Sequence, residues 1–403
     1  MQCSLTGRTI WVFRGFERQR KATIPAGMRE SIWFGSAACL RSWRKRGKSW
    51  KSPRGSNRKG SGDMLIRKLN QEEKIITRPL YEEAFPEDTK PLVDYYYRYK
   101  MEDNEVYAAL SDGRAVGMLC LNPYRVMVRQ KEYPLFYIVA VATAKAYQRK
   151  GIMRAVLTKA LREQAGRGLP FTYLKPANPA YYTPFDFAFI SRRPHRRYRK
   201  ELLRTQTYEE GKEEALLAFM NRYLREHFDI YALRDPRYLR DVCAELRAGN
   251  GSIDLLLDET ALKGVLIRDD PNGPEETARL LFEDAYLERE IRPASLALMG
   301  RILSLPDFAE LAMLDAGCEK KKAVHFFFFQ DAIIEENNGL WRWTLDHNGS
   351  VLEKADRAEG EEIVPRYTPS EFARWMFGEE PSSAAPWCQE IRGMRGVYFD
   401  EET

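Results

Sequence analysis

The most informative part of this chain for its fold is Val141-Ala142-Thr143-Ala144-Lys145-Ala146-Tyr147-Gln148-Arg149-Lys150-Gly151-Ile152-Met153-Arg154. The run 135–143, which leads into it, is almost wholly apolar and predicts a strand covered on both faces. Over 151–166 the apolar residues recur at helical spacing. A buried strand, a short basic loop with one glycine and a helix therefore follow one another.

This order of elements can bind an anion. The first amides of a helix have no partner within the helix, and the positive end of the helix dipole adds to their attraction. Gly151 lets the backbone approach a ligand closely, and Arg149, Lys150 and Arg154 would add positive charge beside a pyrophosphate. A tight strand-to-helix turn with solvated basic side chains has the same spacing, so the pattern alone leaves both interpretations open.

Outward from this stretch, the pattern predicts an α/β fold with a central sheet. We expect strands at 64–68, 105–110, 115–121, 126–129 and 171–174, a helix at 78–85 and a hairpin turn at Asp112-Gly113. The segment 208–247 is predicted to be helical and is followed by a hairpin at 253–268. From about Arg292 the pattern changes to strands at 323–329, 340–345 and 350–354, with a helix at 370–377.

The charge of the chain is unevenly distributed. The 403 residues hold 64 Lys and Arg against 58 Asp and Glu, a formal net charge of +6. The leader, residues 1–63, has 15 basic and three acidic residues, a net charge of +12, so the remainder carries −6. Three hypotheses remain open for the leader: a targeting peptide, a basic arm whose Trp43 and Trp50 stack on nucleic acid, or translated sequence upstream of a true start at Met64. We favour the third, so nucleic acid is not an expected partner.

Cysteines and histidines form no metal or disulfide pattern. The six cysteines are far apart and the four histidines lack ligand spacing, so we expect no metal, no disulfide framework and a reducing compartment. The longest mostly apolar run, 133–144, is shorter than the roughly 20 residues of a membrane-spanning helix. We therefore expect a cytoplasmic protein with no membrane partner.

Two motifs resemble the GNAT superfamily of N-acetyltransferases. Gln148-x-x-Gly151-x-Met153, after Val141-Ala142-Thr143, resembles its motif A, with Met153 in place of a small residue. Tyr182-Thr183-Pro184-Phe185-Asp186-Phe187 is similar to the family's Tyr-x-x-x-Gly-Phe segment, with Asp186 in the glycine position. Met153 and stretches such as Phe228-Asp229-Ile230-Tyr231 and 396–403 look like the Eis-like (enhanced intracellular survival) branch.

The resemblance implies a domain order and an activity. We expect tandem GNAT-like domains and a C-terminal sterol-carrier-protein-like α+β domain, with boundaries at 1–63 (leader), 64–196 (N-terminal GNAT domain), 197–294 (second GNAT-like domain) and 295–403 (C-terminal domain). The family's activity is acetyl transfer from acetyl-CoA, the co-substrate, to a primary amine. The Eis-like branch also implies a homo-oligomer, a hexamer.

The resemblance further implies roles for individual residues. Backbone groups of Val141 and Thr143 would pair with the pantetheine and thioester of acetyl-CoA. Tyr182 would be the general acid, although Tyr181 is an adjacent rival, because only one of two successive strand residues faces the co-substrate. The terminal carboxylate of Thr403 would be the general base, with Glu402 as the alternative. The pyrophosphate would rest on Gln148, Arg149, Lys150, Gly151, Ile152, Met153 and Arg154.

The acceptor is the least determined part. Glu87, Asp88 and Asp94, beside the tyrosines 95–97, lie where the family's acceptor pocket forms. They would suit a cationic amine such as an aminoglycoside, a polyamine or lysine, although a solvated helix face would explain them equally. Two other functions stay open: a non-catalytic acetyl-CoA-binding regulatory module, and a lipid-binding protein that uses the C-terminal domain.

Overall fold

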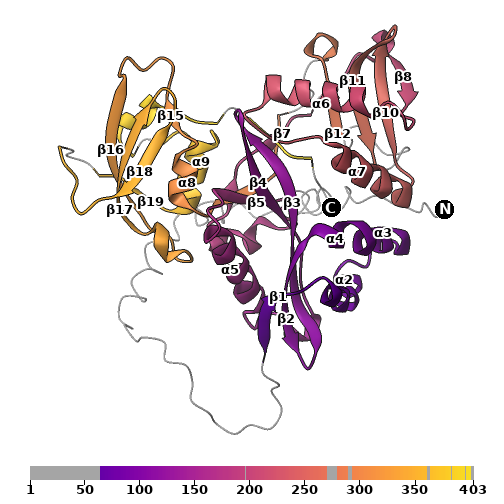
Figure 1. Ribbon diagram of the computed structural model, residues 1–403, viewed down its shortest axis with the longest axis horizontal. Helices are drawn as coiled ribbons and strands as arrows, with labels where there is room; N and C mark the ends of the chain where they lie inside the picture. Colours follow the sequence, from indigo (N-terminus) through magenta and orange to yellow (C-terminus); the bar gives the residue numbers. More distant parts are fainter. Residues whose placement is uncertain are drawn as a thin grey trace, which may run out of the picture. The chain divides into compact units, whose positions relative to one another are not determined.

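The computed structural model describes residues 64–195, 197–269, 279–288, 293–360, 364–382, 384–394 and 396–400. The leader and the last three residues lie outside these ranges. The architecture of the described part is mixed α/β, which confirms the predicted fold class (Figure 1).

The largest sheet has nine strands. Seven of them follow the order β1-β2-β3-β4-β5-β14-β6, while β9 pairs with β3 and β21 pairs with β9. Strands from distant parts of the chain therefore meet in one sheet. The strands are β1 (Leu65–Lys68), β2 (Glu105–Ser111), β3 (Arg114–Val128), β4 (Lys131–Thr143), β5 (Phe171–Leu174), β6 (Ala188–Phe189), β9 (Ile230–Ala232), β14 (Met299–Ile302) and β21 (Val397–Tyr398).

The predicted pair of strands at 115–121 and 126–129 is wrong in one respect, because both belong to the single strand β3. Antiparallel pairing with β4 continues through Pro123, which lies opposite Phe136. Proline lacks an amide donor but keeps an extended backbone, so it does not end the strand.

Helices cover both faces of this sheet, as the alternation along β2 shows. Tyr107 and Ala109 join the core cluster that contains α5 (Ile152–Ala165). Val106 and Ala108 join the cluster that contains residues of α2 (Arg78–Ala84) and α3 (Lys90–Tyr95). Successive side chains of a strand point to opposite faces, so α5 lies on one face and α2 and α3, followed by α4 (Met101–Asp103), on the other (Figure 1).

A second sheet has the order β12-β11-β10-β8. It is packed by α6 (Glu213–His227) and α7 (Pro236–Gly249), whose apolar residues share a core cluster with β10 and β11. Its strands are β8 (Arg204–Thr207), β10 (Ser252–Asp258), β11 (Ala261–Arg268) and β12 (Arg279–Phe282).

The prediction of continuous helix over 208–247 is wrong. Strand β9 separates α6 from α7 and pairs with β3 of the first sheet. Pro236 at the first turn of α7 and the cap at Asp235, whose carboxylate accepts from the amide of Tyr238 at 2.8 Å, start a new helix. Tertiary pairing of Ile230 and its neighbours thus overrides the helical pattern.

The C-terminal part contains a four-stranded sheet of order β18-β17-β16-β19 around an aromatic core. The ring of Phe327 lies 5.4 Å from that of Phe372 and 5.7 Å from that of Trp343. Two further sheets have two strands each: β7 pairs with β13, and β15 pairs with β20. The remaining strands and α-helices are β7 (Arg192–Arg193), β13 (Ser295–Leu296), α8 (Leu305–Ala309), β15 (Met313–Leu314), β16 (Lys322–Phe329), β17 (Gly339–Asp346), β18 (Ser350–Lys354), β19 (Arg366–Tyr367), α9 (Pro369–Met376) and β20 (Ile391–Arg392).

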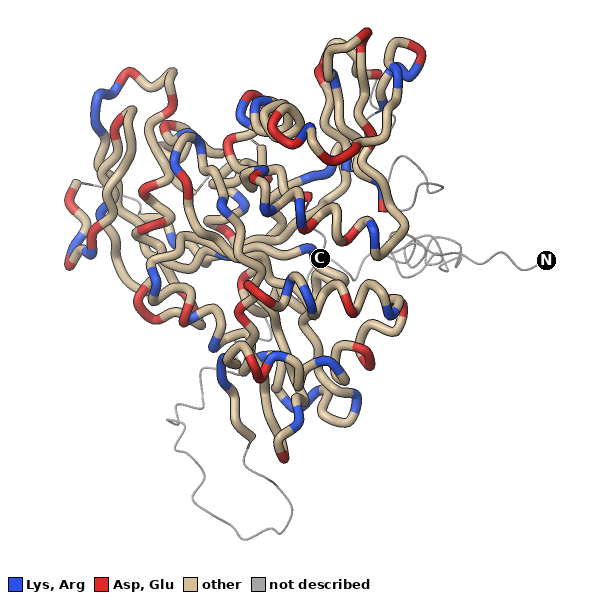
Figure 2. The backbone as a smooth tube through the Cα atoms, turned by 45° about the vertical axis from the view of Figure 1, so that its right-hand side comes forward, with Lys and Arg blue, Asp and Glu red and all other residues tan. Residues whose placement is uncertain are grey.

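Charges of both signs are interspersed along the described chain (Figure 2). None of the helices in the described ranges combines the length and apolarity needed to cross a membrane.

Candidate active site

Strands β4 and β5 separate after a single point of contact. They run parallel and are paired only between Tyr137 and Tyr173. β4 continues to Thr143 and is held on its other edge by β3, where Gly117 pairs with Thr143. Over 138–143 the edge of β4 that faces β5 thus has no strand partner in the described part of the chain. Backbone groups on such an edge can pair with an extended ligand.

A β-bulge lies within this open segment. The register with β3 passes from Met118–Ala142 to Cys120–Val139, so Leu119 alone faces Ala140 and Val141. Ala140 has a φ of 51°, a left-handed conformation that costs a residue with a Cβ about 1–2 kcal/mol. Bulges of this kind redirect the backbone beside active sites. Here the bulge includes Val141, one of the two predicted contacts of the thioester.

The N-terminus of α5 follows this open edge. Gly151 precedes the helix with a φ of 81°, and a Cβ added there would meet no atom within 4 Å. No side chain caps the helix, so the amides of Ile152, Met153 and Arg154 have no partner within the helix. The left-handed backbone favours glycine. The open space and the amides fit the pyrophosphate of acetyl-CoA.

The polar side chains of the loop surround this helix start, and Gln148, Arg149, Lys150 and Arg154 are all exposed. The side-chain Nε2 of Gln148 donates to the carbonyl of Thr143 at 3.3 Å, and the ammonium of Lys150 donates to the carbonyl of Ala146 at 2.8 Å. The guanidinium of Arg154 lies 4.8 Å from the ring centre of Phe185 in the second motif. The fold therefore brings the two predicted motifs together.

Tyr182 is buried, with 8% of its surface exposed, whereas Tyr181 is 57% exposed. The prediction that the pair lies on a strand is wrong, because Tyr181 ends the 3-10 turn Pro179–Tyr181 and Tyr182 links it to the next 3-10 turn, Thr183–Phe185. The ring of Tyr182 packs edge-on against Phe187, 5.9 Å between centres. Burial, with a smaller effect of Tyr181, raises the pKa of Tyr182 to about 12. The phenol therefore holds its proton at neutral pH and can donate it.

Asp186, in the glycine position of the second motif, has a left-handed backbone. Its φ is 60°, and aspartate tolerates this left-handed conformation better than most residues with a Cβ. Burial raises the pKa of Asp186, and the charge of Arg301 opposes that rise. The hydroxyl of Ser370 donates to its carboxylate at 3.5 Å.

The three predicted acceptor contacts lie before and on α3. Asp94 accepts from Arg78 at 2.6 Å and from Lys90 at 2.7 Å, and these bonds, that from Lys90 first, lower its pKa. Asp88 accepts from the hydroxyl of Tyr81 at 2.7 Å, while Glu87 is exposed. The charge of Asp94 is thus compensated within the chain.

The C-terminal tail reaches the place where β4 and β5 separate. After β21, the ring of Phe399 stacks on Tyr173 with 3.9 Å between centres, and Asp400 forms an ion pair with the buried Arg234. Thr403 and Glu402, the predicted alternatives for the general base, lie outside the described residues.

The family model of the acetyltransferase (GNAT) domain matches residues 65–190. This segment contains the open edge of β4, the N-terminus of α5 and Tyr182. It is a GNAT acetyltransferase domain. The GNAT domain therefore includes both motifs on which the resemblance was based, and that part of the prediction is confirmed. None of the curated proteins matches the chain significantly.

Similarity of fold to solved structures extends well beyond the GNAT domain. A probable N-acyltransferase of unknown function from Enterococcus faecalis V583 has a TM-score of 0.65 at 15% identity, covering 82% of this chain and 94% of its own. A GCN5-related N-acetyltransferase from Kribbella flavida has a TM-score of 0.65 at 13% identity, covering 84% and 98%. Eis1 from Mycobacterium abscessus has a TM-score of 0.60 at 13% identity, covering 83% and 98%. At these identities the comparisons establish a shared fold.

Sequence reasoning missed two features of the site. The bulge at Ala140 has no signal in the sequence, because the run 135–143 is almost wholly apolar on both sides of it. The insertion of β14 between β5 and β6 joins segments more than 100 residues apart, and local periodicity says nothing about such pairing.

Proposed function

We propose that the protein is an N-acetyltransferase that transfers the acetyl group of acetyl-CoA to a primary amine. The observation that carries the proposal is the open edge of β4 leading into the uncapped N-terminus of α5. The edge would pair with the amide groups of the extended pantetheine arm. The helix amides, with Arg149, Lys150 and Arg154 nearby, would bind the pyrophosphate.

Acetyl-CoA supplies an acetyl group as a thioester; the neutral amine attacks its carbonyl carbon, a C–N bond forms and the C–S bond breaks. Tyr182 gives its phenolic proton to the departing sulfur and regains one from solvent. Backbone amides of the bulged segment at Val141 donate to the carbonyl oxygen as its charge grows, and one such donor is worth about 3 kcal/mol. The amine loses one proton to a base.

We propose that this base is the terminal carboxylate of Thr403, with the side chain of Glu402 as the alternative. The described tail ends at Asp400 and is anchored by the stacking of Phe399 on Tyr173 of β5 and by the ion pair between Asp400 and Arg234. Adding two residues after Thr403 should abolish transfer, whereas full activity of the extended chain would reassign the base.

For the acceptor we propose a cationic amine, such as an aminoglycoside, a polyamine or lysine. Glu87 and Asp88 stand before α3, and Asp94 is already paired with Arg78 and Lys90. We also propose the tandem GNAT-like arrangement, the sterol-carrier-like identity of 295–403, a cytoplasmic location and a homo-oligomer, following the Eis-like resemblance.

The test measures binding and turnover separately. Calorimetry with acetyl-CoA should show binding, and release of the free thiol should follow when a panel of cationic amines is added. Binding without thiol release on any amine would indicate the non-catalytic module instead. Absence of acetyl-CoA binding would contradict the proposal.

A further inference from the structure

The C-terminal part of the chain contributes a strand to the sheet of the GNAT domain. β14 lies between β5 and β6 and pairs antiparallel with both. β5 and β6 therefore run in the same direction, and the segment 175–187 that joins them must cross β14. This crossing segment contains Tyr182, the proposed general acid.

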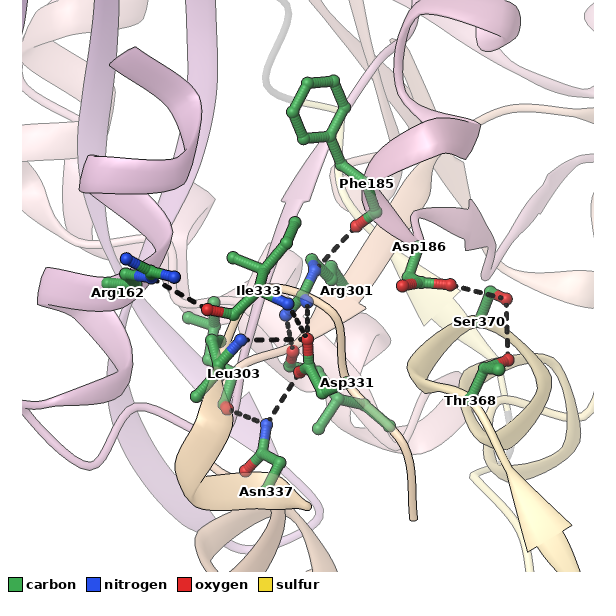
Figure 3. A network of polar contacts seen from close by, with 12 residues as sticks. Arg162, Phe185, Asp186, Arg301, Leu303, Asp331, Ile333, Asn337, Thr368 and Ser370 are labelled. Atoms are coloured by element: carbon green, nitrogen blue, oxygen red, sulfur yellow. Dashed lines mark hydrogen bonds and ion pairs between the residues drawn. The ribbon is translucent and has the colours of Figure 1, made fainter. Parts of the chain in front are cut away.

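Arg301 on β14 lies beneath the crossing segment, and none of its side chain is exposed. Its Nε donates to the carbonyl of Phe185 at 2.7 Å, and its Nη2 donates to Oδ1 of Asp331 at 2.6 Å (Figure 3). The amide of Phe185 in turn donates to the carbonyl of Tyr182 at 2.9 Å. A chain of two hydrogen bonds thus connects the guanidinium to the backbone of Tyr182.

Asp331 is held in place independently of Arg301. Its Oδ1 accepts from the amides of Ile333 at 2.8 Å and Ile334 at 3.0 Å, and its Oδ2 accepts from Nδ2 of Asn337 at 3.0 Å. Like Arg301, its side chain has no exposed surface. A carboxylate fixed in this way holds the planar guanidinium in one orientation.

The same loop is also tied to the helix of the pyrophosphate site. Nε of Arg162, on α5, donates to the carbonyl of Ile333 at 2.8 Å (Figure 3). The loop at 331–337 therefore contacts both halves of the proposed site, through Arg162 on one side and Arg301 on the other.

We propose that Arg301 is a positioning residue for Tyr182. By fixing the carbonyl of Phe185, it holds the turn in the orientation that directs the phenol at the sulfur of acetyl-CoA. The proposal rests on the proposed acetyl transfer and adds that a residue of the C-terminal part completes the site. Phe185 and Asp331 are contacted by different nitrogens of the guanidinium, so the single ammonium of a lysine cannot reproduce both contacts.

The test compares Arg301→Lys with a matched control, Arg129→Lys. Arg129 also joins the first sheet to the C-terminal part, since it donates to the carbonyls of Leu311 at 2.5 Å and Arg392 at 3.2 Å. Arg129 lies at the turn between β3 and β4, and about 26 Å of extended chain along β4 separates this turn from Val139. Arg301→Lys should lower kcat about tenfold or more with an unchanged KM for acetyl-CoA, and Arg129→Lys should leave both unchanged.

The decisive measurement repeats Arg301→Lys in a Tyr182→Phe background. If Arg301 acts through Tyr182, the second substitution adds no further loss of kcat. An equal loss in both backgrounds, or no loss in either, overturns the proposal. If Arg301→Lys fails to fold, Asp331→Asn takes its place, because it keeps the shape of the side chain and one acceptor oxygen. It should lower kcat in the wild-type background and cause no further loss of kcat in the Tyr182→Phe background. A wild-type protein that binds acetyl-CoA but acetylates no amine would instead refute the proposed function.

Discussion

Replacing Gly117 with alanine should weaken acetyl-CoA binding from a position outside the site. A Cβ at this residue of β3 would lie 2.5 Å from Cγ2 of Ile152. Non-bonded carbons prefer about 3.5–4.0 Å, so the pair must separate by about 1 Å. Ile152 is 3% exposed and is the first residue of α5, and it cannot swing into solvent. The start of the helix must therefore move.

The expected size follows from two costs. Overpacking of a core contact destabilises a protein by about 1–3 kcal/mol. Moving the first amides of α5 by about 1 Å weakens hydrogen bonds to a charged phosphate, each worth about 1.5–3 kcal/mol. Losing about 1.4 kcal/mol of binding energy corresponds to a tenfold increase in Kd. We expect Gly117→Ala to raise the Kd for acetyl-CoA about tenfold.

Calorimetry gives the Kd and urea unfolding gives the stability. Gly264→Ala is the matched control, because its Cβ would lie 2.8 Å from Cβ of Phe282 and 2.9 Å from Cδ1 of Leu256 in the second sheet. It should lower stability without changing the Kd. Ile152→Ala removes the atom that a Cβ at residue 117 would contact, so the effects of Gly117→Ala and Ile152→Ala on the Kd should not add. A wild-type Kd for Gly117→Ala, or an equal change for Gly264→Ala, would refute the reasoning.

Three further predictions concern the acid and its support. Tyr182→Phe should lower kcat by a factor of about 10² or more while Tyr181→Phe, at an exposed position, leaves it unchanged, as thiol release would measure. Because the pKa of Tyr182 is raised to about 12 from an ordinary value near ~10, the stability contributed by the buried neutral phenol is complete below the ordinary value. This stability is lost as the pH rises through the pKa of Tyr182 in the folded protein. At about pH 10, where an ordinary tyrosine is half ionised, Tyr182 should still be protonated, so its ionisation should not lower kcat there. Asp331→Leu leaves the charge of the buried Arg301 unpaired and should cost about 3–5 kcal/mol of unfolding free energy, measured by urea unfolding, with Asp331→Asn costing less.

Most local elements of the GNAT domain could be predicted from periodicity. β5 was predicted with its observed bounds, and the helix after Gly151 was predicted to within a residue at each end. These elements depend on the spacing of apolar residues and on turn residues next to them in the sequence. The continuation of β3 through Pro123 and the existence of β9 were not predicted, because both depend on backbone pairing with other strands.

In the candidate site, too, the features that depend on neighbouring residues could be predicted, and those that depend on distant packing could not. The proposed anion site at the start of α5 depends on Gly151 and on residues beside it, and Tyr182 lies in a short motif, so both are predictable from the sequence. The burial that raises the pKa of Tyr182, and the turn that places it, are not. Those depend on Phe187 and on the packing around the crossing segment.

The strand, loop and helix of the proposed co-substrate site could therefore be predicted from the sequence, because these features follow from residues close together in the chain. The distant segments that complete the sheet, β14 between β5 and β6 and β21 beside β9, are seen only in the folded chain, as is the contact of Arg301 with the turn of Tyr182. The physical reason is that a strand edge can pair with any segment of matching shape and register. Which segment does so depends on the packing of the whole chain.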